Sequence, residues 1–413
     1  MLTAGDAHQP HPIAQVMVQR ALDAAPEVRL CRLAITAARS RAHQGLTGHL
    51  QQAGDTGDGG QQQQPVTAIH PTQPNNNSGP LQLTVAILMP DAASFPEMAF
   101  HALESLQPAA ITALAQACEA LVSAEGQISP SAQEREQLQE IFPALVGTAW
   151  PADVVPQLPV GLSGLITQKR QRQEVMQLFT LLAFLEPQLE AQKIDVFRRL
   201  ADDLGLEAGV VEDLEQVCRG HVLKAFGDLY RRSFHDLNND GMVKGFSRFI
   251  LPMLGIGIDT THQARYEALP ASSPGSLGAA LHAYYQHNGF PYPGSRKGLP
   301  YDYVALHDVH HVIGGYATDP DGELQVLAFT MGLFPEHALL IAIPPLMQFQ
   351  VGIADPLAGS VAPKLKDQLR APAFAAALER GSNVVGPIKD IHWDFWTWID
   401  RPLEDVRRDL NVR

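Results

Sequence analysis

The sequence predicts an all-α protein with two helical domains that follow a low-complexity N-terminal region. Apolar residues recur at helical spacing over most of residues 95–218, and few segments alternate as strands do. After Ile250, glycine and proline become frequent, which predicts helices joined by long irregular connections. We expect these connections to surround an apolar cavity.

The N-terminal region, residues 1–90, combines one helical candidate with a linker. Residues 13–41 read as a helix, whereas residues 45–80 are rich in Gly, Gln, Asn and Pro, as in "QQAGDTGDGGQQQQP". Such a segment buries too little apolar surface to offset the entropy of ordering it, so we expect a disordered linker. The start of the chain has no apolar stretch behind basic residues, and no signal peptide is expected.

Residues 91–225 are predicted to form the first helical domain. Ser131 and Glu134 have the spacing of a capping box. The pieces "CEALVSAEGQISPSAQEREQLQEIF" and "QKIDVFRRLADDLGL" resemble the helical TerB-like domain of tellurite-resistance proteins. Glu125 is the one acid in the turn "SAEGQIS", so we expect no metal there. The apolar stripes of this domain are Ile111–Val122, Leu138–Phe142, Val175–Leu185, Ile194–Leu204 and Val210–Val217.

Residues 226–413 are predicted to form the second domain. The run "HALLIAIPPLMQFQVGI" is interrupted by Pro344 and Pro345 and is too short to span a membrane. It is either a buried core helix or the wall of a lipid-binding cavity. The expected helices are Leu277–His287, Tyr301–Ile313, Glu323–Leu333, Pro363–Leu378 and Pro402–Leu410.

A tryptophan cluster lies near the end of the chain, at Trp393, Trp396 and Trp398. Packing in the core is the favoured interpretation, since large aromatic rings bury most of their surface in folded proteins. The alternative is an anchor at a membrane interface.

The segment "FHDLNNDGMVKGFS" matches a calcium loop in part. Asp236, Asn238, Asp240 and Gly241 occupy its first, third, fifth and sixth positions. The twelfth position is Ser247, where such loops have a bidentate Glu. We therefore favour a turn that ends a helix.

Charge and cysteine content exclude several classes of partner and compartment. The formal net charge of −14 disfavours nucleic acid and simple electrostatic docking on anionic lipid. Insertion of an apolar surface into a membrane stays open. Cys31, Cys118 and Cys218 form no CxxC pair, which indicates a reducing compartment. We expect a cytoplasmic protein without a transmembrane helix, with peripheral contact at the inner membrane still allowed.

A metal site is predicted where two expected helices meet. His307 and His311 lie four residues apart, so both imidazoles project from one helix face. Asp308 can converge on the same point. The turn "TDPDG" then sends the chain back, and Glu323 is expected to open the next helix, where the helix dipole also favours an acid. Two imidazoles and two carboxylates suit Zn²⁺, Fe²⁺, Mn²⁺ or Co²⁺, with room for water or substrate.

Two other pairings are open at this stage. His310 also shares a helix face with His307, three residues away. Asp319 and Asp321 could compete with Glu323, although capping of the turn is their favoured role.

The order His-Asp-x-x-His, eleven residues and Glu resembles the signature of the coenzyme Q biosynthesis protein 4 family. His307, Asp308, His311 and Glu323 have the matching spacing. The resemblance covers residues 246–413 and includes "ALPASSPGSLGAALHAYY", "GYATDPDGELQVLAF" and "IHWDFWTWIDRPLEDVRRDLNV".

The resemblance implies a helical, membrane-associated protein of ubiquinone synthesis. It implies that the four motif residues bind a divalent metal, usually zinc, and that an apolar groove holds a prenylated ring precursor. Oxidative removal of the ring carboxyl group and the organisation of other biosynthetic enzymes are the implied functions. The chain has Asp302, Tyr303 and Val304 where mitochondrial members have arginines, which leaves substrate and catalysis open.

Three functions follow as hypotheses. The first is a metal-dependent enzyme of prenylquinone biosynthesis, and the second is a non-catalytic scaffold that binds isoprenoid lipid and partner enzymes. The third, a metal hydrolase with Asp308 as base, is less favoured because the sequence lacks the HExxH glutamate.

Overall fold

Helices form the regular secondary structure of the computed structural model, which describes residues 102–206, 208–253, 258–296, 298–356 and 365–412. These residues contain no β-strand, and their one isolated β-bridge joins Ser276 to Pro402. The predicted all-α fold is confirmed. The expected helix at 13–41 and the linker at 45–80 lie outside the described residues.

The first set of helices contains the five predicted apolar stripes, except that Phe184 and Leu185, the last two residues of the stripe Val175–Leu185, lie beyond the end of their helix. The predicted capping box opens α4: the Ser131 hydroxyl accepts the Glu134 N–H, and the Glu134 carboxylate accepts the Ser131 N–H, both at 3.0 Å. Glu125 pairs with Arg199 at 2.5 Å. The helices are α3 (Pro108–Val122), α4 (Ala132–Val146), α5 (Leu162–Leu165), α6 (Lys169–Ala183), α7 (Ala191–Leu204) and α8 (Ala208–Cys218).

The second set differs from the prediction by more than one residue at two helix starts. One helix begins at Pro320 rather than Glu323, because Asp319 caps it and proline is favoured in a first turn. Another begins at Ala371 rather than Pro363, since residues 365–370 are not helical. The helices are α9 (Val222–Asn238), α10 (Met242–Met253), α11 (Thr260–Ala268), α12 (Leu277–Asn288), α13 (Tyr301–Gly314), α14 (Pro320–Leu333), α15 (Ala338–Leu346), α16 (Ala371–Ser382) and α17 (Leu403–Asp409).

The calcium-loop candidate is a helix-ending turn, as favoured from the sequence. Asn239, at φ +52°, ends α9 in the left-handed conformation. The buried Asp240 carboxylate pairs with Lys244 at 2.5 Å and with Arg248 at 2.8 Å. Burial alone would raise the pKa of Asp240, but these two cations lower it below its usual value. The acid is thus neutralised by side chains of its own chain.

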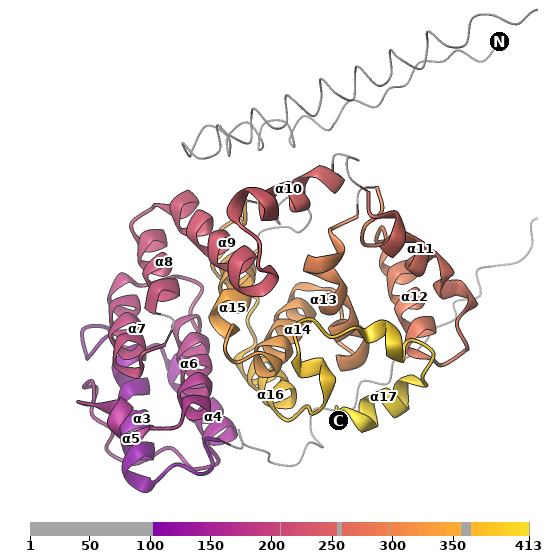
Figure 1. The fold of residues 1–413 in the computed structure, drawn as a ribbon. Coiled ribbons are helices and arrows are strands. Elements are labelled where there is room, and N and C mark those ends of the chain that lie inside the picture. Colours follow the sequence, from indigo (N-terminus) through magenta and orange to yellow (C-terminus); the bar gives the residue numbers. More distant parts are fainter. Residues whose placement is uncertain (1–101, 207, 254–257, 297, 357–364, 413) are drawn as a thin grey trace, which may run out of the picture. The chain divides into compact units, whose positions relative to one another are not determined.

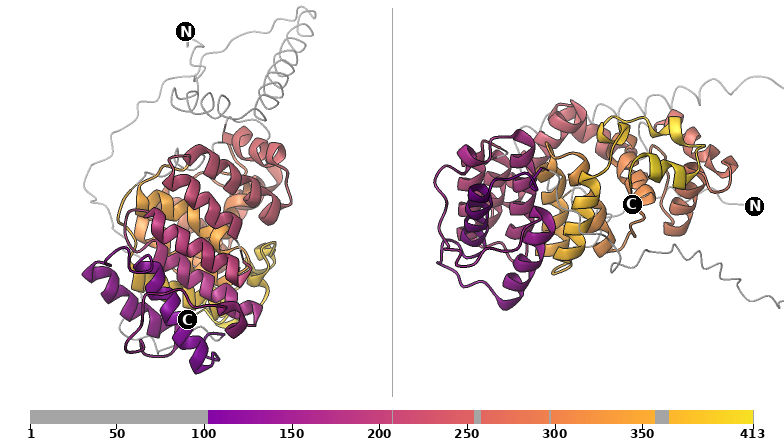
Figure 2. Two further views of the ribbon diagram at one scale, coloured as in Figure 1. Left: turned by 90° about the vertical axis from the view of Figure 1, so that its left-hand side faces the viewer. Right: turned by 90° about the horizontal axis from the view of Figure 1, so that it is seen from below.

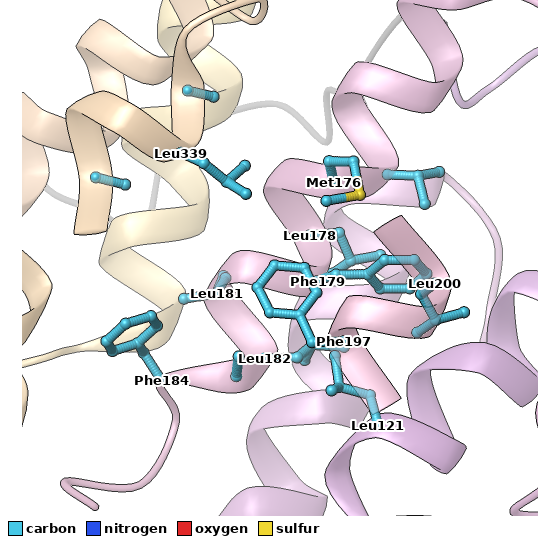
Figure 3. Packing of buried hydrophobic residues seen from close by; sticks show 14 of the residues in the cluster. Leu121, Met176, Leu178, Phe179, Leu181, Leu182, Phe184, Phe197, Leu200 and Leu339 are labelled. Atoms are coloured by element: carbon cyan, nitrogen blue, oxygen red, sulfur yellow. The ribbon is translucent and has the colours of Figure 1, made fainter. Parts of the chain in front are cut away.

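One hydrophobic cluster joins helices from both halves of the chain. Leu121 of α3, Phe179 of α6 and Phe197 of α7 lie in it together with Leu339 of α15 (Figure 3). Figure 2 shows the indigo and magenta helices packed against the orange ones, and α4 contacts α16. Side chains on both sides of the predicted boundary at residues 225 and 226 therefore share one core.

The long apolar run forms part of this core. It folds into α15 and a π-helical turn, Met347–Val351, and its apolar side chains are mostly buried. A hollow of about 310 Å³ lies beside α17, and another of about 480 Å³ lies at the turn between α8 and α9. Neither is lined by a predicted metal ligand, and neither is the expected apolar cavity. None of the helices in the described ranges is long and apolar enough to cross a bilayer.

The tryptophan cluster packs in a second core around α13. Trp393 is buried there, and Trp396 donates a 2.9 Å hydrogen bond from Nε1 to the Tyr301 hydroxyl. The guanidinium of Arg401 lies 4.1 Å above the Trp398 ring. These contacts agree with the favoured interpretation of core packing.

Candidate metal centre

Two neighbouring helices bring the predicted ligands together. Figure 1 shows α13 and α14 side by side, joined by a short turn. The Asp319 carboxylate accepts the Gly322 N–H at 2.8 Å and starts α14. A Cβ atom on Gly322 would lie 2.2 Å from the Ala317 backbone oxygen, so the tight turn requires glycine. This turn places Glu323 opposite the two histidines.

Three of the four motif residues converge on one point. The Nε2 atoms of His307 and His311 lie 3.1 Å apart. The Glu323 carboxylate lies 3.3 Å from His307 Nε2 and 3.4 Å from His311 Nε2. Ligands bound tetrahedrally at about 2.0–2.1 Å from Zn²⁺ are separated from each other by about 3.3 Å. The two Glu323 distances involve different carboxylate oxygens, Oε2 toward His307 and Oε1 toward His311, and one ligand atom from each of the three residues lies within 4.8 Å of the others. This spacing is compatible with one divalent metal bound by all three side chains.

His311 is oriented by a backbone contact. Its Nδ1 lies 3.2 Å from the Tyr316 carbonyl oxygen, which can only accept, so Nδ1 carries the proton. Nε2 then presents a lone pair toward His307 and Glu323, as in histidines that bind metals. The His311 side chain is fully buried, whereas 38% of the His307 side chain is exposed. The site is therefore open to solvent at His307.

Protons and charge are shared within this group. Burial alone would raise the pKa of Glu323, but its contacts with His307, followed by those with His311, lower it to about 2. Burial alone would lower the pKa of His307, and Glu323 raises it above its usual value. His307 and Glu323 thus have the character of an imidazolium beside a carboxylate. A divalent cation can replace the imidazolium proton of His307.

Comparison with known proteins assigns this chain to no family. Searches of protein-family models, curated proteins and solved structures found no match for this chain. The resemblance to coenzyme Q biosynthesis protein 4 rests on the motif and on the sequence segments quoted above.

Asp308, the fourth predicted ligand, faces two tyrosines. It is buried, and its carboxylate accepts hydrogen bonds from the hydroxyls of Tyr284, at 3.2 Å, and Tyr285. Burial raises the pKa of Asp308, although His307 and Tyr285 oppose the shift. Asp308 is not in the group formed by His307, His311 and Glu323. Its role as a ligand stays a prediction.

The competing pairings from the sequence are not formed. His310 points to another face of α13, where Nδ1 lies 3.0 Å from the Thr330 hydroxyl. Burial, followed by the charges of His307 and His311, lowers the pKa of His310 to about 3, so it is neutral. Asp319 caps α14.

Asp321 also lies apart from the metal-binding group. Its carboxylate lies 3.7 Å from Arg370 Nε, at the edge of ion-pair distance. Of the three acids in this turn, only Glu323 faces the histidines.

Sequence reasoning did not identify the residues that surround the ligands. Tyr284 and Tyr285 lie more than twenty positions before Asp308, and Tyr316 contributes its backbone oxygen. The Tyr284 ring also stacks on His311, with ring centroids 5.5 Å apart. The adjacent tyrosines in "LHAYYQHN" carry no spacing signal that links them to the motif, because helix packing makes that link.

Proposed function

We propose that this protein binds one divalent metal ion and acts in prenylquinone biosynthesis. His307, His311 and Glu323 would be donors, with Asp308 as the fourth donor that the motif predicts. The donor set favours Zn²⁺, with Fe²⁺, Mn²⁺ or Co²⁺ as alternatives. The observation that carries this proposal is the convergence of two imidazole nitrogens and one carboxylate at 3.1–3.4 Å.

In this proposal each side chain around the metal position has a different role. Glu323 stays ionised at neutral pH and supplies negative charge, while His311 is fixed by the Tyr316 carbonyl. The half-exposed His307 marks the side from which a substrate reaches the site. When bound, a divalent cation would bind the ring carboxylate and supply positive charge that stabilises negative charge developing elsewhere in the substrate during the reaction.

The assignment to prenylquinone biosynthesis is supported by the motif and by the segments that resemble the family over residues 246–413. A prenylated ring precursor would be the substrate, and other enzymes of the same synthesis would be partners. In the alternative function the metal only joins α13 to α14, and the protein is a non-catalytic scaffold that binds isoprenoid lipid. The two functions share the metal and differ in whether quinone synthesis requires it.

Metal content tests the site directly. We expect protein purified under mild conditions to contain, or to take up, one divalent metal per chain. His307→Ala and Glu323→Ala should lose it, because each removes one donor. Asp321→Asn is the matched control, since Asp321 lies on the same turn of α14 but outside the donor group. A wild-type protein that takes up no divalent metal overturns the proposal.

Cellular quinone content tests the pathway and separates the two functions. The full chain and the two alanine variants would be expressed in source cells that lack the gene, and quinones and co-purifying lipids would be extracted. We expect quinone to fall without the gene and to be restored by the wild type alone. Normal quinone with a metal-free variant would exclude the enzyme and favour the scaffold. Normal quinone without the gene would exclude the pathway.

A further inference from the structure

The last turn of the ligand helix α13 is held by two arginines from distant helices. Arg407 of α17 donates from Nε to the Ile313 oxygen and from Nη2 to the Val312 oxygen, both at 3.0 Å. Arg380 of α16 donates from Nη1 to the Gly314 oxygen at 2.5 Å. The last four carbonyls of a helix have no partner within it. Here three of them accept from guanidinium groups.

The fourth carbonyl belongs to His311 itself. It accepts the N–H groups of Gly315, at 2.8 Å, and Tyr316, at 3.1 Å. Gly315 adopts φ +76°, the left-handed conformation in which glycine commonly ends a helix. The chain then turns so that the Tyr316 carbonyl reaches His311 Nδ1. The turn of residues 314–316 therefore fixes both the helix end and the imidazole.

Arg380 holds this turn at two places. Besides its hydrogen bond to Gly314, its guanidinium lies 5.4 Å from the centre of the Tyr316 ring, within cation–π range. Arg407 donates to the carbonyls of Val312 and Ile313, the two residues before the turn, and its guanidinium also pairs with Glu404 at 2.7 Å. The planar, multi-donor guanidinium suits such contacts, and a lysine ammonium reproduces them only in part.

We infer that Arg380 and Arg407 are positioning residues of the metal centre. They hold the end of α13 and its following turn, and thereby keep His311 Nε2 directed at His307 and Glu323. This inference rests on the proposed metal site. Both arginines are cations that repel a bound metal, so a purely electrostatic effect of removing them has the opposite sign to a positional one.

The test compares variants that keep the charge with variants that remove it. Arg380→Lys and Arg407→Lys keep the charge, whereas Arg380→Met and Arg407→Met keep only the length of the side chain. The Zn²⁺ affinity of the full chain would be measured by competition with a chromophoric chelator, and the absorption spectrum with Co²⁺ would report ligand geometry. We expect the Met variants to bind Zn²⁺ about 10- to 100-fold more weakly, as for other residues that orient ligands. The Lys variants should lie between them and the wild type, with altered Co²⁺ spectra in both sets.

Two exposed arginines provide matched controls. Arg408 lies next to Arg407 on α17 and pairs with Asp405, and Arg370 lies just before α16. Arg408→Met and Arg370→Met should leave both the Zn²⁺ affinity and the Co²⁺ spectrum unchanged. Loss of affinity in these controls to the same degree would overturn the inference.

Each outcome of these measurements either supports or overturns the role of the two arginines. Circular dichroism and thermal melting would establish that a variant is folded, and where a Met variant does not fold, its Lys counterpart decides. Zn²⁺ affinity equal to or tighter than wild type in the folded variants overturns the role of the arginines and leaves the metal site intact. A wild-type chain that binds neither Zn²⁺ nor Co²⁺ removes the site itself and this inference with it.

Discussion

The side-chain nitrogen of Gln177 lies 2.7 Å from the backbone oxygen of Met331, and this buried hydrogen bond joins α6 to α14. In a continuing helix the Met331 oxygen would accept from the residue four positions later. That residue is Pro335, which has no N–H. Gln177 supplies the missing donor to the helix that carries Glu323. The bond thus ties the first set of helices to the second.

Gln177→Met should therefore destabilise the protein. Methionine keeps the volume but leaves the Met331 oxygen without its donor. Gln177 Oε1 has no hydrogen-bond partner of its own, so its removal offsets part of the loss. We expect the free energy of unfolding to fall by about 1 kcal/mol, measured by urea denaturation. Gln133→Met, at an exposed position of α4, should change it by less than about 0.5 kcal/mol. Equal midpoints for the two variants would contradict this role of Gln177.

A second prediction concerns the close crossing of α14 and α16. A Cβ atom on Gly381 would lie 2.0 Å from the Phe329 backbone oxygen, so Gly381→Ala must push the helices apart. We expect the free energy of unfolding to fall by about 1–3 kcal/mol. Gly227, within α9, has open space around its Cβ position, and Gly227→Ala should gain about 0.5–1 kcal/mol. Thermal unfolding should thus give shifts of opposite sign, and a neutral Gly381→Ala would show that the crossing adapts.

Local patterns in the sequence predicted much of the fold and the centre of the site. The apolar stripes gave the helices because burial of one helix face is a local periodicity. The spacing of His307 and His311 predicted that both lie on one face of α13. The turn after α13 predicted that Glu323 lies opposite them. The prediction placed the start of α14 three residues too late. Aspartate is favoured both in turns and at helix N-caps, so Asp319 alone does not show where the turn ends and the helix begins.

Contacts between distant segments could not be predicted in the same way. Tyr285 meets Asp308 only because α12 packs on α13, and Arg407 reaches Ile313 across 94 positions. Neither pair has a spacing that marks it in the sequence. The orientation of Asp308 toward the tyrosines, rather than toward His311, is likewise a product of packing. Local patterns thus identify candidate ligands, while tertiary contacts determine how they are held.

The pH dependence of stability should carry a contribution from Glu379. Burial, together with the charge of Glu104, raises the pKa of Glu379 from its usual 4.5 to about 7. Between these two values the folded state binds more protons than the unfolded state, so this group lowers stability as the pH rises through that window. Glu379→Gln should raise the melting temperature at pH 8 more than at pH 5. The exposed Glu136→Gln should not, and the same pH slope in wild type and Glu379→Gln would exclude this contribution.

Metal affinity should fall as the medium becomes acidic. The His307 imidazole must lose its proton to bind metal, and its pKa lies above the usual 6.5 because Glu323 outweighs the effect of burial. Glu323, with a pKa of about 2, stays ionised and adds no pH dependence near neutrality. We expect the apparent Zn²⁺ affinity to drop between pH 8 and pH 6, approaching about tenfold per pH unit for each proton displaced. Affinity that is constant over this range would show that no imidazole binds the metal.

Asp308 provides the test of the complete donor set. If it is the fourth ligand, Asp308→Asn should weaken Zn²⁺ binding to a degree comparable with Glu323→Gln, because each removes an anionic oxygen donor. Tyr285→Phe keeps the carboxylate and removes only a hydrogen bond that orients it, so its effect should be smaller, about 10- to 100-fold. Tyr292→Phe is the control, since the Tyr292 hydroxyl bonds to His282.

The outcome for Asp308→Asn then decides between three protein ligands and four. Wild-type affinity in this variant would mean that two histidines and Glu323 are the whole donor set, as they already converge in the structure. A site with three protein donors leaves more positions for water or substrate than a site with four. The same titration would therefore also indicate how much of the metal's coordination is available to a ring carboxylate.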